Sequence, residues 1–244
     1  MQLLHFQSSL GPVSYRLIGD GNRKVVFFHG FPGSSSQLHL FLSSLVEHQM
    51  QVLCFDRPGY NKTFSAGADM LNVTSQITYE LTAYLSWQKF EVVTVSGGTP
   101  YGISFAQKFP ESVSGVRVIC GLGYIREPQI RKYITGLKYL SLLLLRFVPG
   151  WALRLIINPD QKKVSNKRRR FFELFYPTSE SDRQIISERN LGGTLGFVLN
   201  ESLMQNGRGP VSDTKVFLSD WGADLGRFSL PIHFWHGDED KVIS

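Results

Sequence analysis

A serine stands among small residues directly after an apolar run, in the segment Val92-Val93-Thr94-Val95-Ser96-Gly97-Gly98-Thr99-Pro100-Tyr101. The β-branched residues up to Val95 predict a strand, and a helical pattern begins at Thr99. A sharp turn between the two would lift the Ser96 hydroxyl clear of a sheet. Free N–H groups at the helix N-terminus would then face negative charge that develops beside it. We expect Ser96 to be a nucleophile; the alternative is an ordinary Gly-rich turn, for example one that binds phosphate.

Two further segments could complete such a site. His29-Gly30-Phe31-Pro32-Gly33 follows the apolar run Lys24–Phe28, and a Gly-rich loop there can present a backbone N–H beside Ser96. Near the end of the sequence, Pro231–Trp235 predicts a strand that leads into the acidic turn His236-Gly237-Asp238-Glu239-Asp240. In open α/β sheets, ligands bind at the edge formed by the carboxyl ends of the strands. We therefore expect all three segments to meet at that edge.

The elements that would position these residues follow from the hydrophobic pattern. Strands are predicted over Leu3–Gln7, Val13–Ile18, Lys24–Phe28, Gln51–Phe55, Glu91–Val95, Val116–Cys120 and Pro231–Trp235, and helices over Ser36–His48, Thr74–Trp87 and Thr99–Phe109. Apolar strands separated by helices are typical of parallel βαβ units. We predict an α/β fold with a mostly parallel sheet and helices on both faces. The pattern from Tyr124 to Phe228 is mostly helical, so we divide the chain into a core over 1–123, a helical insertion over 124–228 and a return to the core over 229–244.

Composition excludes several classes of protein. The 244 residues are 42% hydrophobic and 19% charged, which is typical of a globular chain and not of a disordered one. Two cysteines exclude a disulfide scaffold and a Cys-rich zinc module, and we expect no metal and no cofactor. No apolar run approaches the ~20 residues of a membrane span, and no secretory signal is evident. We expect a soluble, cytoplasmic protein without a membrane span.

The net charge of +6 has a local origin. Six basic residues lie in the run Lys162–Arg170, and outside it the basic and acidic residues balance at 20 each. Such a run could bind nucleic acid or an anionic membrane. We expect a solvated surface instead, because neither interleaved aromatic residues nor a second basic cluster supports binding. A nucleic-acid-binding module is accordingly the weakest functional hypothesis.

Four segments, in this order along the chain, resemble motifs of the α/β-hydrolase superfamily. They are His29-Gly30-Phe31-Pro32-Gly33, Phe55-Asp56-Arg57-Pro58-Gly59-Tyr60, Val95-Ser96-Gly97-Gly98 with Pro100-Tyr101, and His236-Gly237-Asp238-Glu239-Asp240. The resemblance covers nearly the whole chain. It implies Ser96 as the nucleophile and Asp240 as the triad acid, with Asp238 as second choice. It also implies the backbone N–H groups of Phe31 and Gly97 as the oxyanion hole.

The chain departs from the family pattern in two places. Thr94 replaces the first glycine of G-x-S-x-G and adds a β-branched side chain where close packing is expected. In the family order the catalytic histidine follows the acid, whereas all histidines here (His5, His29, His39, His48, His233 and His236) precede Asp240, and the sequence ends four residues later. We expect a C-terminally incomplete form that lacks the triad histidine with the last strand and helix, and is therefore inactive or impaired. Asp56 is expected to stabilise its own turn, paired with Arg57 or with backbone.

The functional hypotheses follow from the resemblance. The leucine-rich segments Tyr139–Leu145 and Phe147–Leu153 would belong to a helical cap, with Leu143, Leu144 and Tyr101 contacting the substrate; alternatively, the leucines only pack the cap on the sheet. The leading hypothesis is a serine hydrolase that cleaves a carboxylic ester or related acyl bond of a small molecule. Serine at position 96 argues against dehalogenase and epoxide hydrolase chemistry, in which relatives carry aspartate there. The alternative is a non-catalytic, hydrolase-like protein that binds a small molecule. The sequence does not indicate the oligomeric state.

Overall fold

The computed structural model describes residues 2–42, 47–67, 69–124, 144, 147–157, 179–221 and 228–240. Seven strands form one sheet in the order β1-β2-β4-β3-β5-β6-β7. They are β1 (Leu4–Ser8), β2 (Gly11–Ile18), β3 (Arg23–Phe28), β4 (Met50–Phe55), β5 (Phe90–Val95), β6 (Val113–Ile119) and β7 (Ile232–Trp235). The β1–β2 and β2–β4 pairs are antiparallel, and every other neighbouring pair is parallel. The predicted mostly parallel α/β sheet is confirmed.

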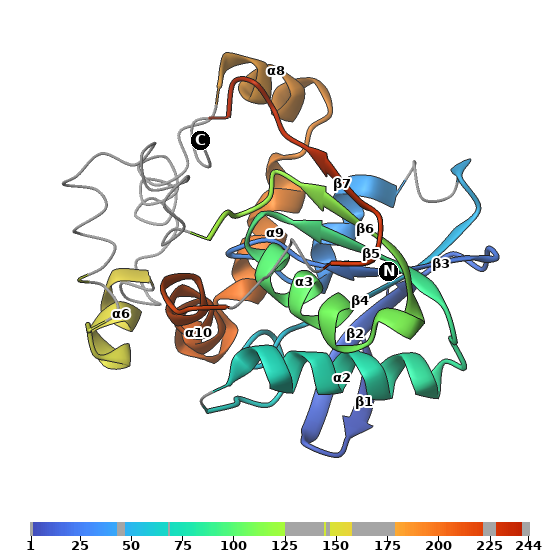
Figure 1. Ribbon diagram of the computed structural model, residues 1–244. Helices are drawn as coiled ribbons and strands as arrows, with labels where there is room; N and C mark the ends of the chain where they lie inside the picture. The colour runs from blue at the N-terminus through green and yellow to red at the C-terminus, as the bar shows by residue number, and fades with distance from the viewer. Residues whose placement is uncertain are drawn as a thin grey trace.

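Helices cover both faces of the sheet (Figure 1). On one face lie α2 (Met70–Tyr84) and α3 (Thr99–Lys108), and on the other lies the 3-10 helix η1 (Ser35–Phe41). Alternate residues of β3 point to opposite faces of the sheet. Val26 and Phe28 belong to the core cluster under α2 and α3, whereas Val25 and Phe27 pack with Leu38 of η1. Because both faces are buried, the strand reads as a continuous apolar run.

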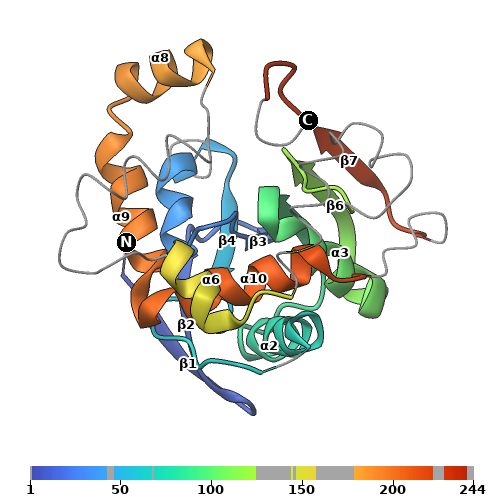
Figure 2. The same cartoon turned by 90° about the vertical axis from the view of Figure 1, so that its left-hand side faces the viewer.

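The described residues between β6 and β7 contain helices and no strand. They form α6 (Gly150–Ile157), α8 (Glu180–Glu188), α9 (Gly192–Ser202), η4 (Met204–Gly207) and α10 (Arg208–Leu218). Figure 2 looks onto the carboxyl edge of the sheet and shows α10 lying across it. Helix α9 packs against η1. The edge that carries Ser96 is therefore covered by a helix that is distant from it in sequence.

Two helix boundaries differ from the sequence prediction. Helix α2 begins at Met70 rather than Thr74, because the Asp69 carboxylate caps it by accepting the Asn72 N–H. It ends at Tyr84 rather than Trp87, since Ser86 adopts a left-handed φ of 60°. The helix predicted over 36–48 begins as a 3-10 helix over Ser35–Phe41, and Leu42 and Glu47, also described, are α-helical.

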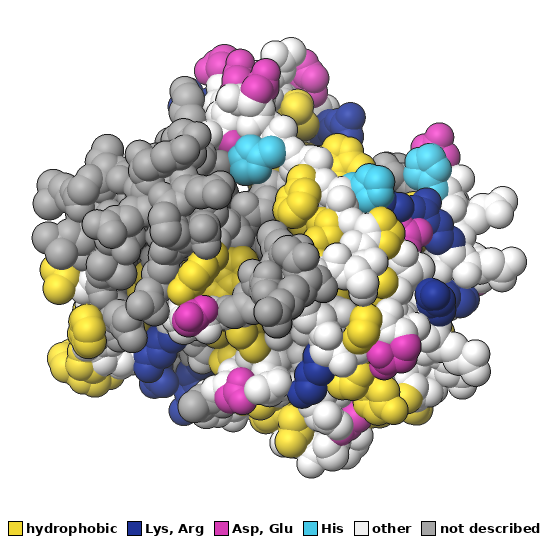
Figure 3. All heavy atoms as spheres, in the orientation of Figure 1, with side chains coloured by type: hydrophobic (Ala, Val, Ile, Leu, Met, Phe, Trp, Pro, Cys, Tyr) yellow, Lys and Arg dark blue, Asp and Glu magenta, His cyan; other side chains and the backbone are white. Residues whose placement is uncertain are grey.

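A row of exposed apolar side chains lies on and before α6. Trp151 and Leu155 are four residues apart in α6, so they share one side of the helix, and Phe147 lies in the turn before it; each of the three is more than 60% exposed. Figure 3 shows hydrophobic side chains at the lower left, where Figure 1 places α6. Even so, no helix in the described part of the chain combines the length and the apolar composition needed to cross a bilayer.

Candidate active site

Ser96 lies at the junction of β5 and α3. The strand ends at Val95, one 3-10 turn, η2 (Ser96–Gly98), follows, and α3 begins at Thr99. Ser96 has a left-handed φ of 49°, which is uncommon outside glycine and turns the chain sharply. The carbonyl oxygen of Ser96 accepts the Thr99 hydroxyl at 2.8 Å, which holds the turn. Ser96 is half-buried, and its hydroxyl forms no hydrogen bond with the described residues.

The two glycines after Ser96 are required by close packing. A Cβ at Gly97 would lie 2.5 Å from Phe31 Cβ, and one at Gly98 would lie 2.3 Å from the carbonyl oxygen of Phe28. Both separations are shorter than van der Waals contact, and the second involves backbone that cannot move aside. The absence of side chains at 97 and 98 lets the head of α3 approach the loop after β3. Gly97 and Phe31 are therefore brought together.

Thr94 stands where the family pattern has a glycine, and a glycine in the neighbouring helix α3 makes room for its side chain. A Cβ at Gly102 in α3 would lie only 2.2 Å from the γ-methyl carbon of Thr94. Gly102 thus provides the space that the G-x-S-x-G pattern provides at the position of Thr94. The β-branched side chain is fully buried beside β5 without displacing the turn.

His29 organises the loop that follows β3. It is fully buried, and its Nδ1 lies 2.9 Å from the carbonyl oxygen of Gly30. A carbonyl only accepts, so Nδ1 carries the proton and Nε2 accepts the Arg57 N–H at 3.4 Å. Burial, reinforced by the charge of Arg57, lowers the pKa of His29 well below its ordinary value. His29 is therefore a neutral structural group with both ring nitrogens occupied.

Arg57 joins this loop to α10. Its side chain is 1% exposed, and its two terminal nitrogens donate to the carbonyls of His29 at 2.6 Å and Gly30 at 3.2 Å. The same guanidinium forms an ion pair with Asp213 of α10 at 2.5 Å. Burial opposes the charge of Arg57, but the combined effects of Asp213, Tyr60 and Tyr101 leave the pKa of Arg57 above its ordinary value. The arginine stays charged inside the protein.

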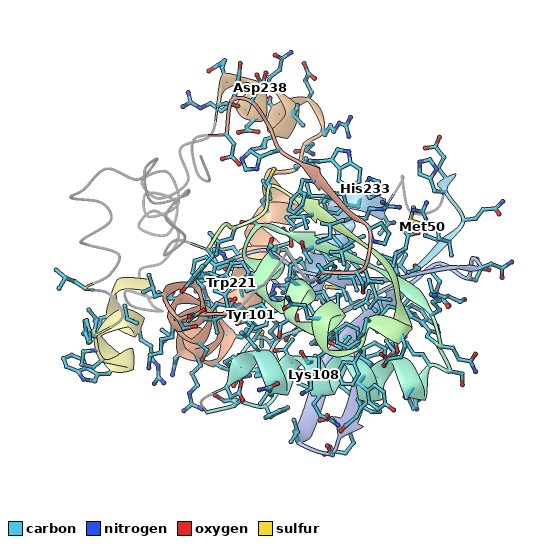
Figure 4. The ribbon with its side chains drawn as sticks, in the orientation of Figure 1. Met50, Tyr101, Lys108, Trp221, His233 and Asp238 are labelled. Atoms are coloured by element: carbon cyan, nitrogen blue, oxygen red, sulfur yellow. The ribbon has the colours of Figure 1, made fainter. Side chains whose placement is uncertain are left out.

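Two tyrosines complete the surroundings of Asp213. The hydroxyl of Tyr60 donates to one carboxylate oxygen at 2.6 Å, and that of Tyr101 donates to the other at 2.5 Å. Burial, followed by the charge of Asp213, raises the pKa of both tyrosines well above the ordinary value, so both remain donors. Figure 4 labels Tyr101 where α3 faces α10. Tyr101, predicted to contact the substrate, is fully buried here with its hydroxyl engaged by Asp213.

A second buried carboxylate, Asp56, holds the N-terminus of η1. It accepts the Ser35 N–H at 2.6 Å and the Asn61 side-chain amide at 3.1 Å. Asp56 thus pairs with the backbone of η1 and with a side chain of its own loop, whereas Arg57, another predicted partner, pairs with Asp213 instead. Burial raises the pKa of Asp56 to about 6, although the Ser35 N–H opposes this shift.

Arg16 and Glu201 form a second link between the sheet and the β6–β7 helices. The ion pair spans 2.7 Å and is buried on both sides. Glu201, from α9, also accepts the Ser34 hydroxyl at 2.9 Å. Two arginines of the N-terminal half thus pair with two acids of the β6–β7 segment.

The wall beside Ser96 is aromatic. The rings of Phe31 and Phe217 meet edge to face with their centroids 5.2 Å apart. Phe217 Cζ lies 2.7 Å from the position that a Cβ at Gly97 would take, which places the tip of the ring against the turn. Phe217 follows Asp213 by one helical turn of α10. An apolar group of a ligand bound at Ser96 would contact these rings.

The acid turn after β7 makes its described contacts with itself and with α8. Asp240 lies 3.2 Å from Nε2 of His236, and its side chain is 15% exposed. Glu239 accepts the Ser181 hydroxyl of α8 at 2.9 Å. Asp238 is exposed at the outer end of the turn (Figure 4). The role of Asp240 as triad acid stays a prediction.

Other predicted positions are less informative. Leu143 and the basic run 162–170 lie outside the described residues, and Leu144 is 57% exposed. Within the described ranges, no three His, Cys, Asp or Glu side chains gather as metal ligands. The sequence prediction missed Asp213 and Phe217. An acid among the apolar positions of α10 was the available signal, because a buried carboxylate needs a cationic partner.

The sheet order, the left-handed serine and the Gly-rich loop define one class of protein, and sequence comparison agrees. The chain belongs to the α/β hydrolase fold family, whose pattern matches residues 24–174. It is 32% identical over 116 residues to the uncharacterized hydrolase YNR064C of Saccharomyces cerevisiae, a match that covers 46% of this chain and 39% of that protein. It is 29% identical over 105 residues to the uncharacterized hydrolase YcgS of Bacillus subtilis, covering 43% and 36%. The matches thus span well under half the length of these relatives.

Among solved structures, a bromoperoxidase from Bacillus anthracis has a similar fold. Its TM-score is 0.73 at 18% identity, and the alignment covers 99% of this chain and 83% of that one. At this level of identity the likeness shows a shared architecture and not a shared reaction.

Proposed function

We propose that this protein is a serine hydrolase that cleaves a carboxylic ester or related acyl bond of a small molecule. The observation that carries the proposal is the left-handed Ser96 at the head of α3, whose half-buried hydroxyl is unbonded within the described part of the chain. Such a hydroxyl can reach a carbonyl carbon, whereas a serine in a regular strand or helix would be occupied by its neighbours.

The chemistry follows from the surroundings of Ser96. Its oxygen attacks the acyl carbon and the hydroxyl proton passes to a base; the tetrahedral intermediate then expels the alcohol and leaves an acyl-enzyme, which water hydrolyses. The N–H groups of Phe31 and Gly97 stabilise the oxyanion, and a single such donor is worth about 10² to 10³ in kcat. The N-terminus of α3 adds its positive dipole end.

Asp240 is proposed to orient the base, which is an imidazole in this chemistry. His29 cannot serve, because it is buried, neutral and bonded at both nitrogens. His236 is already paired with Asp240 in its own turn. We therefore propose that the 244-residue chain turns over slowly on its own. A positioned base contributes about 10² to 10⁴ in rate, so imidazole added to the solution should recover part of that factor.

The substrate is proposed to carry an apolar acyl or alcohol group. Phe31 and Phe217 form an aromatic wall against Gly97, next to the attacking oxygen. Binding an apolar chain there removes both the chain and the rings from water. The β6–β7 segment, residues 124–228, would then act as a cap over the site, with Leu143 and Leu144 as further candidate contacts.

The test is hydrolysis of 4-nitrophenyl butyrate by the 244-residue chain, with and without imidazole. We expect a rate that rises with the concentration of neutral imidazole by about tenfold or more. In Ser96→Ala the rise should be absent apart from the reaction of imidazole with the ester in buffer. Labelling by a fluorophosphonate in the presence of imidazole should likewise depend on Ser96. Equal rates for the two proteins would contradict the proposal.

A second candidate is a small-molecule-binding protein without turnover. The pairing of Asp240 with His236 favours it, because the acid then has a partner that does not belong to a triad. This function predicts saturable binding of apolar esters without labelling of Ser96 at any imidazole concentration.

A further inference from the structure

The Arg57 guanidinium holds the peptide unit that carries the proposed oxyanion donor. The carbonyl of Gly30 and the N–H of Phe31 belong to one trans peptide group, which is planar, so the N–H points opposite to the C=O. Arg57 donates to that carbonyl at 3.2 Å, and His29 donates to it at 2.9 Å. Fixing the oxygen of Gly30 therefore fixes the direction of the Phe31 N–H.

Arg57 is itself fixed by Asp213. The ion pair is bidentate, with Nε 3.3 Å from one carboxylate oxygen and a terminal nitrogen 2.5 Å from the other. The guanidinium carbon also lies 4.6 Å from the ring centroid of Tyr101 and 5.3 Å from that of Tyr60. A planar cation gripped at both ends and between two rings has one accessible orientation.

The hydrogen-bond acceptor positions of the Asp213 carboxylate are all occupied. It accepts four hydrogen bonds, two from Arg57 and one each from Tyr60 and Tyr101. Four is about the full complement of a carboxylate, and Asp213 is completely buried. Water therefore cannot replace a lost partner, and removal of the charge would release Arg57 from its position.

We propose that Asp213 is a positioning residue for the oxyanion hole: through Arg57 it orients the Gly30–Phe31 peptide, and so couples the placement of α10 to stabilisation of the transition state. The inference rests on the proposed function of Ser96 and Phe31. Phe217, one turn further along α10, contacts the Phe31 ring from the ligand side. A ligand that packs on Phe217 thus contacts α10, the helix that through Asp213 also orients the Phe31 N–H.

The test compares Asp213→Asn with Glu201→Gln. The second variant is a matched control, because Glu201 also lies in the β6–β7 segment and also forms a buried ion pair with an arginine of the core. Arg16 donates to neither His29 nor Gly30 in the described contacts. Both substitutions neutralise a buried acid, so both should lower stability, and only Asp213→Asn should disturb the oxyanion donor.

With 4-nitrophenyl butyrate and saturating imidazole, Asp213→Asn should lower kcat by about tenfold to a hundredfold and change KM by less than about threefold, since a misdirected donor acts mainly in the transition state. The dissociation constant of phenylboronic acid, which forms a tetrahedral anion on the serine, should rise by about the same factor as kcat falls. The ¹H–¹⁵N signal of the Phe31 amide should move in Asp213→Asn and stay in Glu201→Gln.

Equal kcat losses in the two variants, or a loss that appears in KM alone, would overturn the inference. If Asp213→Asn does not fold, Tyr60→Phe serves instead, because it removes one donor from Asp213 and keeps the ring. It should lower kcat by about threefold at constant KM, and an unchanged kcat overturns the inference. Failure of the proposed function is distinct: Ser96→Ala would then keep the full rate. In that case the Phe31 amide signal still decides whether Asp213 orients the peptide.

Discussion

The γ-methyl group of Thr94 occupies the space beside Gly102 that any side chain at position 102 would need. The two residues belong to β5 and α3, on either side of the turn that carries Ser96. Their sizes are complementary, because a Cβ at 102 would lie 2.2 Å from the methyl carbon. The turn therefore depends on the combined size of residues 94 and 102, and a glycine at one particular position of the two is not required.

Gly102→Ala should destabilise the protein. Alanine normally stabilises a helix relative to glycine by about 0.5 to 1 kcal/mol, but here the added methyl group overpacks the core at a cost of about 1 to 3 kcal/mol. The double variant Thr94→Ala/Gly102→Ala should recover most of the loss. Urea unfolding of the native protein, Thr94→Ala, Gly102→Ala and the double variant gives the coupling energy between the two sites. Additive effects would show that the two sites do not compete for space.

Ser96→Gly should be more stable than Ser96→Ala. The left-handed backbone at position 96 costs about 1 to 2 kcal/mol for a residue with a Cβ and almost nothing for glycine. The greater flexibility of glycine in the unfolded chain offsets part of this gain, so we expect a difference of about 1 kcal/mol. Both variants should lose imidazole-dependent turnover. Chemical denaturation measures the first effect, and equal stabilities would argue that the turn is unstrained.

Asp56 should make stability depend on pH. The pKa of Asp56 is about 6 in the folded protein and 3.8 for an ordinary aspartate, so the folded state binds more protons between these values. The free energy of unfolding contributed by this group therefore falls as the pH rises from about 4 to about 6, by about 3 kcal/mol in all. Asp56→Asn removes this contribution. Its stability relative to the native protein should rise across that pH range, and parallel pH profiles would contradict the assignment.

Phe217→Ala should weaken the binding of apolar esters. Loss of the ring beside Gly97 opens the wall of the site, and we expect KM for 4-nitrophenyl butyrate to rise by about tenfold, because an apolar contact of this size is worth about 1 to 3 kcal/mol. Phe197→Ala is the control, since that ring is 47% exposed on α9 and meets the ring of His39 edge to face. Equal KM values for the two variants would place the acyl group elsewhere.

Leu144→Ser distinguishes a substrate contact from simple packing. The side chain is 57% exposed, so the substitution should change the free energy of unfolding by less than about 0.5 kcal/mol. If Leu144 contacts the ligand, the preference for longer acyl chains should decrease while stability holds. Plain loss of stability, measured by thermal unfolding, would instead indicate that the leucine packs the helices on the sheet.

The sheet and the turn at Ser96 could be predicted because their signals are local. Strand segments buried on both faces, such as Val25–Phe28 of β3, are continuous apolar runs, and the strand–helix alternation indicates parallel pairing. The boundaries of α2 were less accurate, since they depend on the Asp69 cap and the left-handed Ser86 rather than on periodicity.

The role of α10 could not be predicted because its partners are remote in sequence. Asp213 meets Arg57 and Tyr101, which lie more than a hundred residues earlier. Hydrophobic periodicity predicts which side of a helix is buried, but it does not predict which residue pairs with an acid on that side. Thr94 is a different case, because its partner Gly102 is near in sequence, but the contact between them depends on how α3 packs on β5.

The pairing of Arg16 with Glu201 and of Arg57 with Asp213 limits how this protein can be recombined. A hybrid that kept the sheet and took the β6–β7 helices from another protein would bury two guanidinium groups without counter-ions. Each unpaired charge costs about 3 to 5 kcal/mol, which together approach the entire stability of a typical domain. The helices and the sheet are therefore expected to be inherited together, with both acids retained whenever the arginines are.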